Sequence, residues 1–118
     1  MAAAGAQDIY TTTRNWKWSP AEKGIARKAF EQALEEELRQ IVADFQNEAA
    51  AVKDATELWE IESWLARRRK VIDEKYDYRY SVLAIVFGRL LRERRVKESD
   101  LQGLAPEKLE LIRNTSQF

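Results

Sequence analysis

The chain has 118 residues, which is enough for one domain with a hydrophobic core but short for two. It contains 20 basic and 20 acidic residues, and this zero net charge argues against a strongly basic nucleic-acid-binding protein. It contains no Cys and no His, which excludes disulfides, thiolate nucleophiles, Ser-His triads and metal sites built on those residues. We therefore expect no catalytic residues, no metal and no cofactor, and the composition favours a protein that binds a partner.

Charge is distributed unevenly along the chain. Residues 31–62 contain ten acidic and two basic residues, a net charge of −8. The segments 1–30, 63–79 and 80–118 carry net charges of +3, +3 and +2. Acidic and basic surfaces that are separated in this way favour self-complementary pairing or a polar partner surface.

The first 17 residues show no apolar periodicity, so we predict a mobile N-terminal arm over 1–17 and a single helical domain over 18–118. Trp16 and Trp18 either cover an exposed end of the core or belong to a partner-binding arm. No signal-peptide pattern is evident, and the longest apolar run, Val82 to Phe87, is too short to span a membrane. A cytoplasmic location without an integral membrane segment is the expectation.

The first predicted helix begins at Ser19-Pro20-Ala21-Glu22, which has the pattern of a capping box with Pro in the first turn. Apolar residues then recur at spacings of three and four: Phe30, Leu34, Leu38, Ile41, Phe45, Ala49 and Val52. A helix from residue 20 to about 52 is about 50 Å long, whereas a compact domain of this size has a radius of gyration of about 13–14 Å. Such a helix either breaks or is covered by a second chain, and we predict an antiparallel helical dimer.

A second helix is predicted from Asp54-Ala55-Thr56-Glu57, another capping-box pattern. Its apolar face consists of Leu58, Ile61, Leu65, Ile72 and Tyr76. The run Arg67-Arg68-Arg69-Lys70 is interpreted mainly as a solvated face. Because consecutive residues point about 100° apart, at least one of the four lies near the apolar stripe and needs a partner. The acidic segment 31–62 predicts ion pairs between helices or between subunits for this run.

The segment from Tyr80 to Leu91 is the most apolar part of the chain, and we predict a buried helix because no second strand-like run exists to pair with it. Leu101 and Leu104 are expected on a short helical turn. Gly103 and Pro106 then mark a loop and the start of a last helix. The predicted fold class is all-α, with about four helices.

A search for chemistry finds no phosphate-binding loop and no nucleophile elbow, because the four glycines are scattered. The cluster Glu35-Glu36-Glu37 is interpreted as a solvated face or a patch for a partner. Tyr76, Tyr78 and Tyr80 are expected to pack in the core and at a helix cap. An RNA-binding surface that uses these tyrosines and nearby basic residues is the alternative.

One block of the sequence has a distinctive pattern, which consists of Leu58-Trp59, Leu65, Arg69, Ile72-Asp73, Lys75-Tyr76-Asp77, Arg79, Ser81-Val82, Val86-Phe87 and Leu90-Leu91. This block resembles the fluorescence recovery protein family of cyanobacteria. Outer matches from Trp18-Ser19 to Ile112 extend the resemblance over roughly residues 18–115. The resemblance implies an all-α fold in which long helices form an antiparallel dimer stalk and a small helical head sits beside it.

The resemblance also implies a non-enzymatic regulator of photoprotection. Such a protein binds the photoactivated, red form of the orange carotenoid protein, mainly through that protein's C-terminal domain. It accelerates reversion to the orange form, so that phycobilisome fluorescence recovers from non-photochemical quenching. Physically, this is a shift of populations and barriers that follows from binding one conformer better than another. The implied place of action is the cytoplasm, next to phycobilisomes on the thylakoid, with no nucleic acid involved.

The family's interface pattern is a Trp, a His-Asp pair and an Arg on one helix, and Trp59 and Arg69 match its two ends. Glu62 and Ser63 stand where the family has His and Asp, so the chain departs from the pattern there. The expected interface residues, toward the partner or within the dimer, are Trp59, Glu62, Ser63, Arg69, Leu58, Leu38 and Phe45.

The resemblance also points to residues on the head surface, where Ile85, Lys108 and Leu111 are the candidates. Lys108 matches a basic residue of the family near the start of the last helix, and Leu111 replaces a later one. These departures, with those at Glu62 and Ser63, motivate an alternative function. The alternative is a helical scaffold or chaperone-like dimer that has a different protein partner.

Overall fold

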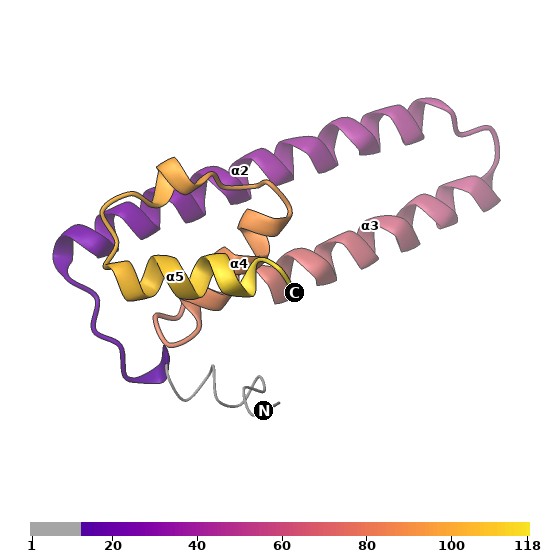
Figure 1. Cartoon of the computed structure of the whole chain (residues 1–118). Coiled ribbons are helices and arrows are strands. Elements are labelled where there is room, and N and C mark those ends of the chain that lie inside the picture. Colours follow the sequence, from indigo (N-terminus) through magenta and orange to yellow (C-terminus); the bar gives the residue numbers. More distant parts are fainter. Residues whose placement is uncertain (1–12) are drawn as a thin grey trace.

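The computed structural model describes residues 13–118, and most of the predicted arm lies outside the described residues. Two long antiparallel helices, α2 (Pro20–Ala50) and α3 (Ala55–Lys75), form a hairpin. The segments α4 (Leu83–Arg92), η1 (Glu98–Leu101) and α5 (Pro106–Thr115) form a head beside the open end of this hairpin (Figure 1). Residues 13–118 contain no β-strand, which confirms the all-α prediction.

The N-terminal ends of the two long helices lie where the sequence predicts them. At α2, the Ser19 hydroxyl accepts a hydrogen bond from the Glu22 backbone N–H at 3.1 Å, and the Glu22 carboxylate accepts one from the Ser19 N–H at 3.0 Å. At α3, the Asp54 carboxylate accepts a bond from the Glu57 N–H at 3.0 Å. The reciprocal bond is absent there, because the Glu57 carboxylate binds the Lys53 N–H instead. The predicted capping box is therefore complete at α2 and half formed at α3.

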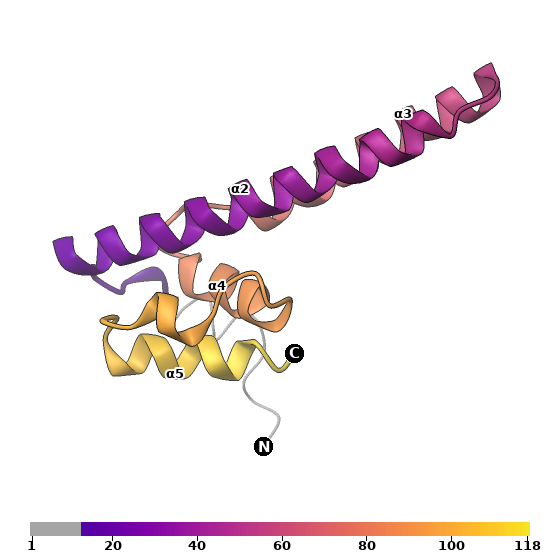
Figure 2. The ribbon, with the colours of Figure 1, turned by 90° about the horizontal axis from the view of Figure 1, so that it is seen from above.

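The head packs onto the N-terminal half of α2, and Figure 2 shows that it lies on one side of the hairpin. Small residues on α2 allow the head to approach closely, and large residues of α4 fill the centre. The buried core consists of Trp18, Ala26, Ala29, Phe30, Ala33, Leu83, Ala84, Val86, Phe87, Leu90, Val96, Leu101, Leu104 and Ile112. The predicted buried helix is therefore confirmed, although it begins at Leu83 rather than near Tyr80.

The molecule is elongated, because the hairpin extends well beyond the head. The Cα atoms have a radius of gyration of 17.4 Å and principal extents of 53 × 33 × 20 Å. This radius exceeds the roughly 13–14 Å of a compact domain of the same length. Within residues 13–118, no helix is both long enough and apolar enough to cross a lipid bilayer.

Residues 13–18 lie against the head, which differs from the mobile arm predicted up to residue 17. Thr13 is buried and its hydroxyl donates a hydrogen bond to the Ser81 carbonyl at 2.7 Å. The Lys17 carbonyl accepts a bond from Lys108 Nζ at 2.7 Å, and Trp18 is only 6% exposed. Of the two interpretations of the tryptophans, the structure supports the one in which they cover an end of the core.

The tyrosines between α3 and α4 belong to this core. The Tyr78 and Phe30 rings meet edge to face, with centroids 4.8 Å apart, and Tyr76 contacts Phe30 in the same manner at 5.5 Å. Tyr80 packs on Trp18 at 5.7 Å. The rings therefore stabilise the junction between stalk and head, as expected, and do not form an open surface for stacked bases.

Gly88 marks the closest approach of α4 to α5, and replacing it with Ala is expected to lower the free energy of unfolding by about 1–3 kcal/mol. A Cβ atom at this position would collide with the Thr115 hydroxyl and lie 2.9 Å from Thr115 Cβ. Gly24→Ala is the matched control, because a Cβ there meets no atom of residues 13–118 within 4 Å. Helix propensity predicts that this control gains up to about 1 kcal/mol. Urea unfolding measures both, and equal effects of the two changes would contradict the packing argument.

Candidate functional site

The far half of the hairpin exposes large apolar side chains that one chain does not cover. Besides Trp59, the exposed residues there are Leu38, Val42 and Phe45 on α2 and Leu58 and Leu65 on α3. We count about 100° per residue, clockwise when each helix is viewed from its own N-terminus. The exposed residues of α2 then lie about 60–120° clockwise from Phe30, which faces the inside of the hairpin. Those of α3 lie about 40–60° clockwise from the inward-facing Ile61. Because the two helices are antiparallel, both sets emerge on the same side of the hairpin, and we call this surface the apolar face.

The apolar face is directed away from the head. Residues of α2 that contact the head, such as Ala26, Ala29 and Ala33, lie counterclockwise from Phe30, on the other side of the hairpin. Leu38 and Phe45 remain 44% and 38% exposed. The apolar stripe predicted along α2 therefore divides: Phe30 and Ile41 are buried within one chain, whereas Leu38 and Phe45 are not. A face of this kind on a stable helix indicates a protein interface.

Trp59 is the most prominent aromatic side chain of the hairpin, with 59% of its surface exposed. It borders an open hollow of about 330 Å³, which is also lined by Thr56, Glu60, Ser63 and Arg67. This hollow lies along the solvent side of α3, next to the apolar face. Trp59 and Ser63 thus line the same hollow, and an exposed Trp on a rigid helix is a typical anchor of a protein interface.

Glu62 and Arg69 lie on the same side of α3 as Leu58 and Leu65. Arg69 makes an exposed ion pair with Asp73 one turn later, with 3.8 Å between Nε and Oδ2. Ser63 and Arg69 are six residues apart and point about 120° from each other, so they do not meet on one helix. The structure therefore separates the predicted interface residues into two neighbouring groups, one at Trp59 and one on the apolar face.

One residue of the basic run lies near the apolar stripe, as predicted. Arg68 is half-buried, seven residues after Ile61 and four before Ile72. Its buried Nε atom has no hydrogen-bond partner among the residues that the structure describes. Arg67, Arg69 and Lys70 are exposed.

The three head candidates lie in different environments. Ile85 and Leu111 are half-buried and reach the surface. Lys108 is 4% exposed, so its placement on the head surface was wrong. Its Nζ atom donates hydrogen bonds to both carboxylate oxygens of Glu22 at 3.0 Å and to the Lys17 carbonyl. Lys108 therefore joins α5 to the start of α2.

The Glu22 carboxylate is the centre of this contact. It accepts hydrogen bonds from the N–H groups of Ser19 and Ala105 and from Lys108. Burial by itself would raise the pKa of Glu22, but these bonds to the charged form outweigh it and lower the pKa to about 2. The capping residue that the sequence identifies is thus also a buried contact between stalk and head.

The pKa of Glu22 predicts a loss of stability in acid. Because the folded-state pKa lies below the ordinary value of 4.5, the stabilisation is complete above about pH 4.5 and disappears as the pH falls toward 2. Glu22→Gln is expected to destabilise the protein near neutral pH, with a difference from wild type that shrinks over this range. Urea unfolding at several pH values measures it, with the exposed Glu36→Gln as control. A difference that does not change with pH would contradict the assignment.

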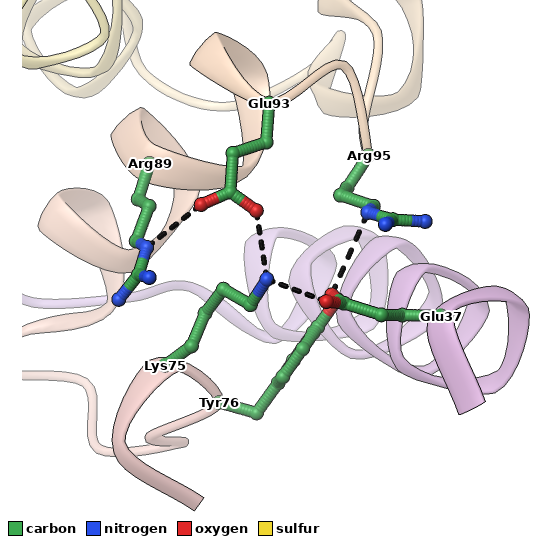
Figure 3. A network of polar contacts seen from close by, with 6 residues as sticks. All are labelled: Glu37, Lys75, Tyr76, Arg89, Glu93 and Arg95. Carbon is green, nitrogen blue, oxygen red and sulfur yellow. Dashed lines mark hydrogen bonds and ion pairs between the residues drawn. The ribbon is translucent and has the colours of Figure 1, made fainter. Parts of the chain in front are cut away.

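A second buried ionic contact joins α2, α3 and the end of α4 (Figure 3). Lys75 Nζ lies 2.7 Å from a carboxylate oxygen of Glu37 and 2.7 Å from one of Glu93. Tyr76 donates its hydroxyl to Glu37 at 2.7 Å, and Arg95 Nε lies 3.5 Å from the same carboxylate. We call these five residues the charged cluster. Glu37 is 3% exposed, so its interpretation as part of a solvated acidic face was wrong.

The two carboxylates of the charged cluster, those of Glu37 and Glu93, are ionised near neutral pH. Burial would raise the pKa values of Glu37 and Glu93, but hydrogen bonds from Lys75 to both and from Tyr76 to Glu37 lower them. Burial and the bond to Glu37 raise the pKa of the Tyr76 hydroxyl, so it remains a donor. The cluster therefore has a structural role, holding the head at a fixed angle to the stalk.

Sequence reasoning missed the charged cluster, although the sequence contains a signal for it. Glu37 lies seven residues after Phe30 and four before Ile41, on the inward side of α2. Lys75 lies three residues after the buried Ile72. A charged residue at an apolar position of a helix predicts a buried partner of opposite charge.

Within residues 13–118, no group of three or more acidic side chains is placed to hold a metal ion.

Comparison with known proteins agrees with this arrangement. The family model for the photoprotection regulator fluorescence recovery protein matches residues 18–116. The fluorescence recovery protein of Synechocystis sp. is 36% identical over 96 residues, covering 81% of this chain and 88% of that protein.

Solved structures extend the similarity to the fold. The Fremyella diplosiphon fluorescence recovery protein is 33% identical, with a TM-score of 0.82 over 86% of this chain and all of that one. The Synechocystis structure is 34% identical, with the same TM-score and the same coverage. The chain therefore belongs to the fluorescence recovery protein family of photoprotection regulators.

Proposed function

We propose that this protein binds the photoactivated form of an orange carotenoid protein, accelerates its reversion to the orange form and so restores phycobilisome fluorescence. The observation that carries the proposal is Trp59, which is exposed on α3 at the position of the family's interface Trp. Trp and Arg side chains dominate the binding energy of many protein interfaces, and Trp59 and Arg67 both line the open hollow on α3. In this proposal the activity involves no covalent step and takes place in the cytoplasm beside the phycobilisome.

The proposed mechanism is differential binding. A protein that binds one conformer along the reversion path better than the photoactivated form lowers the barrier to return. The rigid helix α3 presents Trp59 without the ordering cost of a flexible loop. The charged cluster and the Glu22–Lys108 contact hold the head at a fixed position, so stalk and head can bind one partner together.

We further propose that the protein acts as an antiparallel dimer in which the apolar faces of two hairpins pack together. The exposed residues Leu38, Phe45 and Leu58 support this, because a second hairpin would remove all three from water. The heads would then lie at opposite ends of a four-helix stalk, on its outer sides.

The experiment that tests the proposed function is dark reversion of photoconverted orange carotenoid protein, followed by absorbance. We expect the rate to rise with added protein, and Trp59→Ala to reduce the acceleration at least about tenfold while the dimer stays intact. Phe118→Ala, which removes another exposed aromatic ring, is the matched control. An unchanged rate at excess wild-type protein would overturn the proposal.

A second candidate function is a helical scaffold that binds a different protein. It is favoured by Glu62 and Ser63, which replace the family's His-Asp pair beside Trp59. Affinity capture with wild-type and Trp59→Ala protein separates the two candidates. Retention of an orange carotenoid protein by wild type alone supports the first. Retention of another protein by wild type alone, repeated with that purified protein, supports the second.

A further inference from the structure

We propose that Glu62 of one chain forms an ion pair with Arg69 of the partner subunit, and that two such reciprocal pairs set the register of the dimer. This inference rests on the dimer proposed above. It assigns a specific role to Glu62, one of the positions at which this chain departs from its family.

The spacing of residues on α3 supports the pairing. Leu58, Leu65 and Ile72 are seven residues apart, so they form one row with only about 20° of drift per step. Glu62 and Arg69 lie four residues after Leu58 and Leu65, in the adjacent row on the same side. The apolar row is therefore flanked by one acidic and one basic side chain, which is the arrangement of residues beside the seam of a coiled coil.

An antiparallel arrangement of two α3 helices gives both the apolar row and the adjacent charged row a partner. The midpoint between Glu62 and Arg69 falls beside Leu65. A two-fold axis crossing α3 at this point places Glu62 opposite the partner's Arg69 on both sides of the axis. The same axis places Leu65 opposite its own copy, so an apolar contact and the charged contacts form together.

The exposed residues of α2 indicate the same centre independently. The midpoint between Leu38 and Phe45 falls at residues 41–42. Because α2 ends at Ala50 and α3 begins at Ala55, this point lies level with residues 63–64 of α3. The offset from Leu65 is about two residues, or about 3 Å along the helix. The apolar face and the charges therefore define a single dimer centre.

The charges also select the orientation of the two chains. A parallel arrangement would align Glu62 with Glu62 and Arg69 with Arg69, and like charges placed in this way disfavour association. Among residues 13–118 of one chain, Arg69 has only the exposed pair with Asp73, at 3.8 Å, with side chains 84% and 68% exposed. Exchanging such a pair for one at an interface costs little.

Charge reversal tests the pairing through partner choice. A homodimer of Glu62→Arg places Arg opposite Arg twice, and a homodimer of Arg69→Glu places Glu opposite Glu twice. The mixed dimer of the two variants restores opposite charges at both sites. We expect mixing to favour the heterodimer about tenfold over the statistical distribution, corresponding to about 1.4 kcal/mol. This preference should weaken at high salt.

The matched control is the pair Glu60→Arg and Arg67→Glu. These residues are also exposed and seven apart, but they lie about 160° around α3 from Glu62, away from the apolar face. Native mass spectrometry of differently tagged variants measures the heterodimer fraction, and circular dichroism verifies that each variant folds. The control pair is expected to give the statistical fraction.

The outcomes separate this inference from the dimer itself. Preferential heterodimers for the Glu62 and Arg69 variants alone support the pairing. A wild-type dimer with statistical mixing of both variant pairs overturns the pairing and leaves the dimer proposal standing. A wild-type monomer at micromolar concentration overturns both.

Discussion

Replacing Lys75 with Met is expected to lower the free energy of unfolding by about 3–5 kcal/mol. Lys75 is 4% exposed and neutralises two carboxylates, those of Glu37 and Glu93. Without the ammonium group, Glu37 would be left as a buried charge with only Tyr76 and the more distant Arg95 beside it. Breaking a buried ion pair by removing one partner is among the most destabilising single changes, because the remaining charge stays desolvated.

Urea unfolding at a fixed protein concentration measures this effect, since the stability of a dimer depends on concentration. Lys70→Met is the matched control: it makes the same change on the same helix at an exposed position, and we expect an effect within about 0.5 kcal/mol. Glu37→Gln combined with Lys75→Met should cost less than the sum of the single changes. Equal effects of the Lys75 and Lys70 variants would contradict a buried cluster.

Replacing Phe45 or Leu38 with Glu is expected to weaken the dimer at least about 100-fold, because two-fold symmetry would bury each new carboxylate twice. Both side chains lie on the apolar face, where they are partly exposed in one chain. The fold of each single chain should persist, since neither residue belongs to the core beneath the head. We therefore expect a folded monomer.

Light scattering coupled to size-exclusion chromatography measures the mass, and circular dichroism verifies the helices. Asn47→Glu is the matched control, because it adds the same charge two residues after Phe45 but about 160° around α2 from it, away from the apolar face. We expect it to remain a dimer. An unchanged mass for both the Phe45 and Leu38 variants would show that the apolar face is not the dimer interface.

Local sequence patterns were sufficient to predict the helices. Ser19 with Glu22 and Asp54 with Glu57 mark the two helix starts, because capping depends on residues within one turn. The length of α2 was predicted from an unbroken apolar period, and its exposed far half follows from that length. The matches at Trp59 and Arg69 indicated the family for a similar reason, since they lie on one helix at fixed spacing.

Contacts between segments that are distant in the sequence could not be predicted from such local patterns. Lys108 lies 86 residues from Glu22, and Lys75 lies 38 residues from Glu37. Each of these side chains is charged and would be expected in solvent from its type alone. The choice of one partner among 20 acidic residues depends on how the head folds back onto α2, which local spacing does not encode.

The sequence by itself thus determined the helical class, the helix starts and a stalk too long for one compact subunit, because these follow from periodicity and from contacts within a few residues. Its zero net charge and lack of His left no pattern for acid–base chemistry at neutral pH. Only the tertiary structure decided which charges are buried and which side of the hairpin remains apolar. Burial depends on what packs against a residue, and here the head covers one side of α2 while the other side stays exposed.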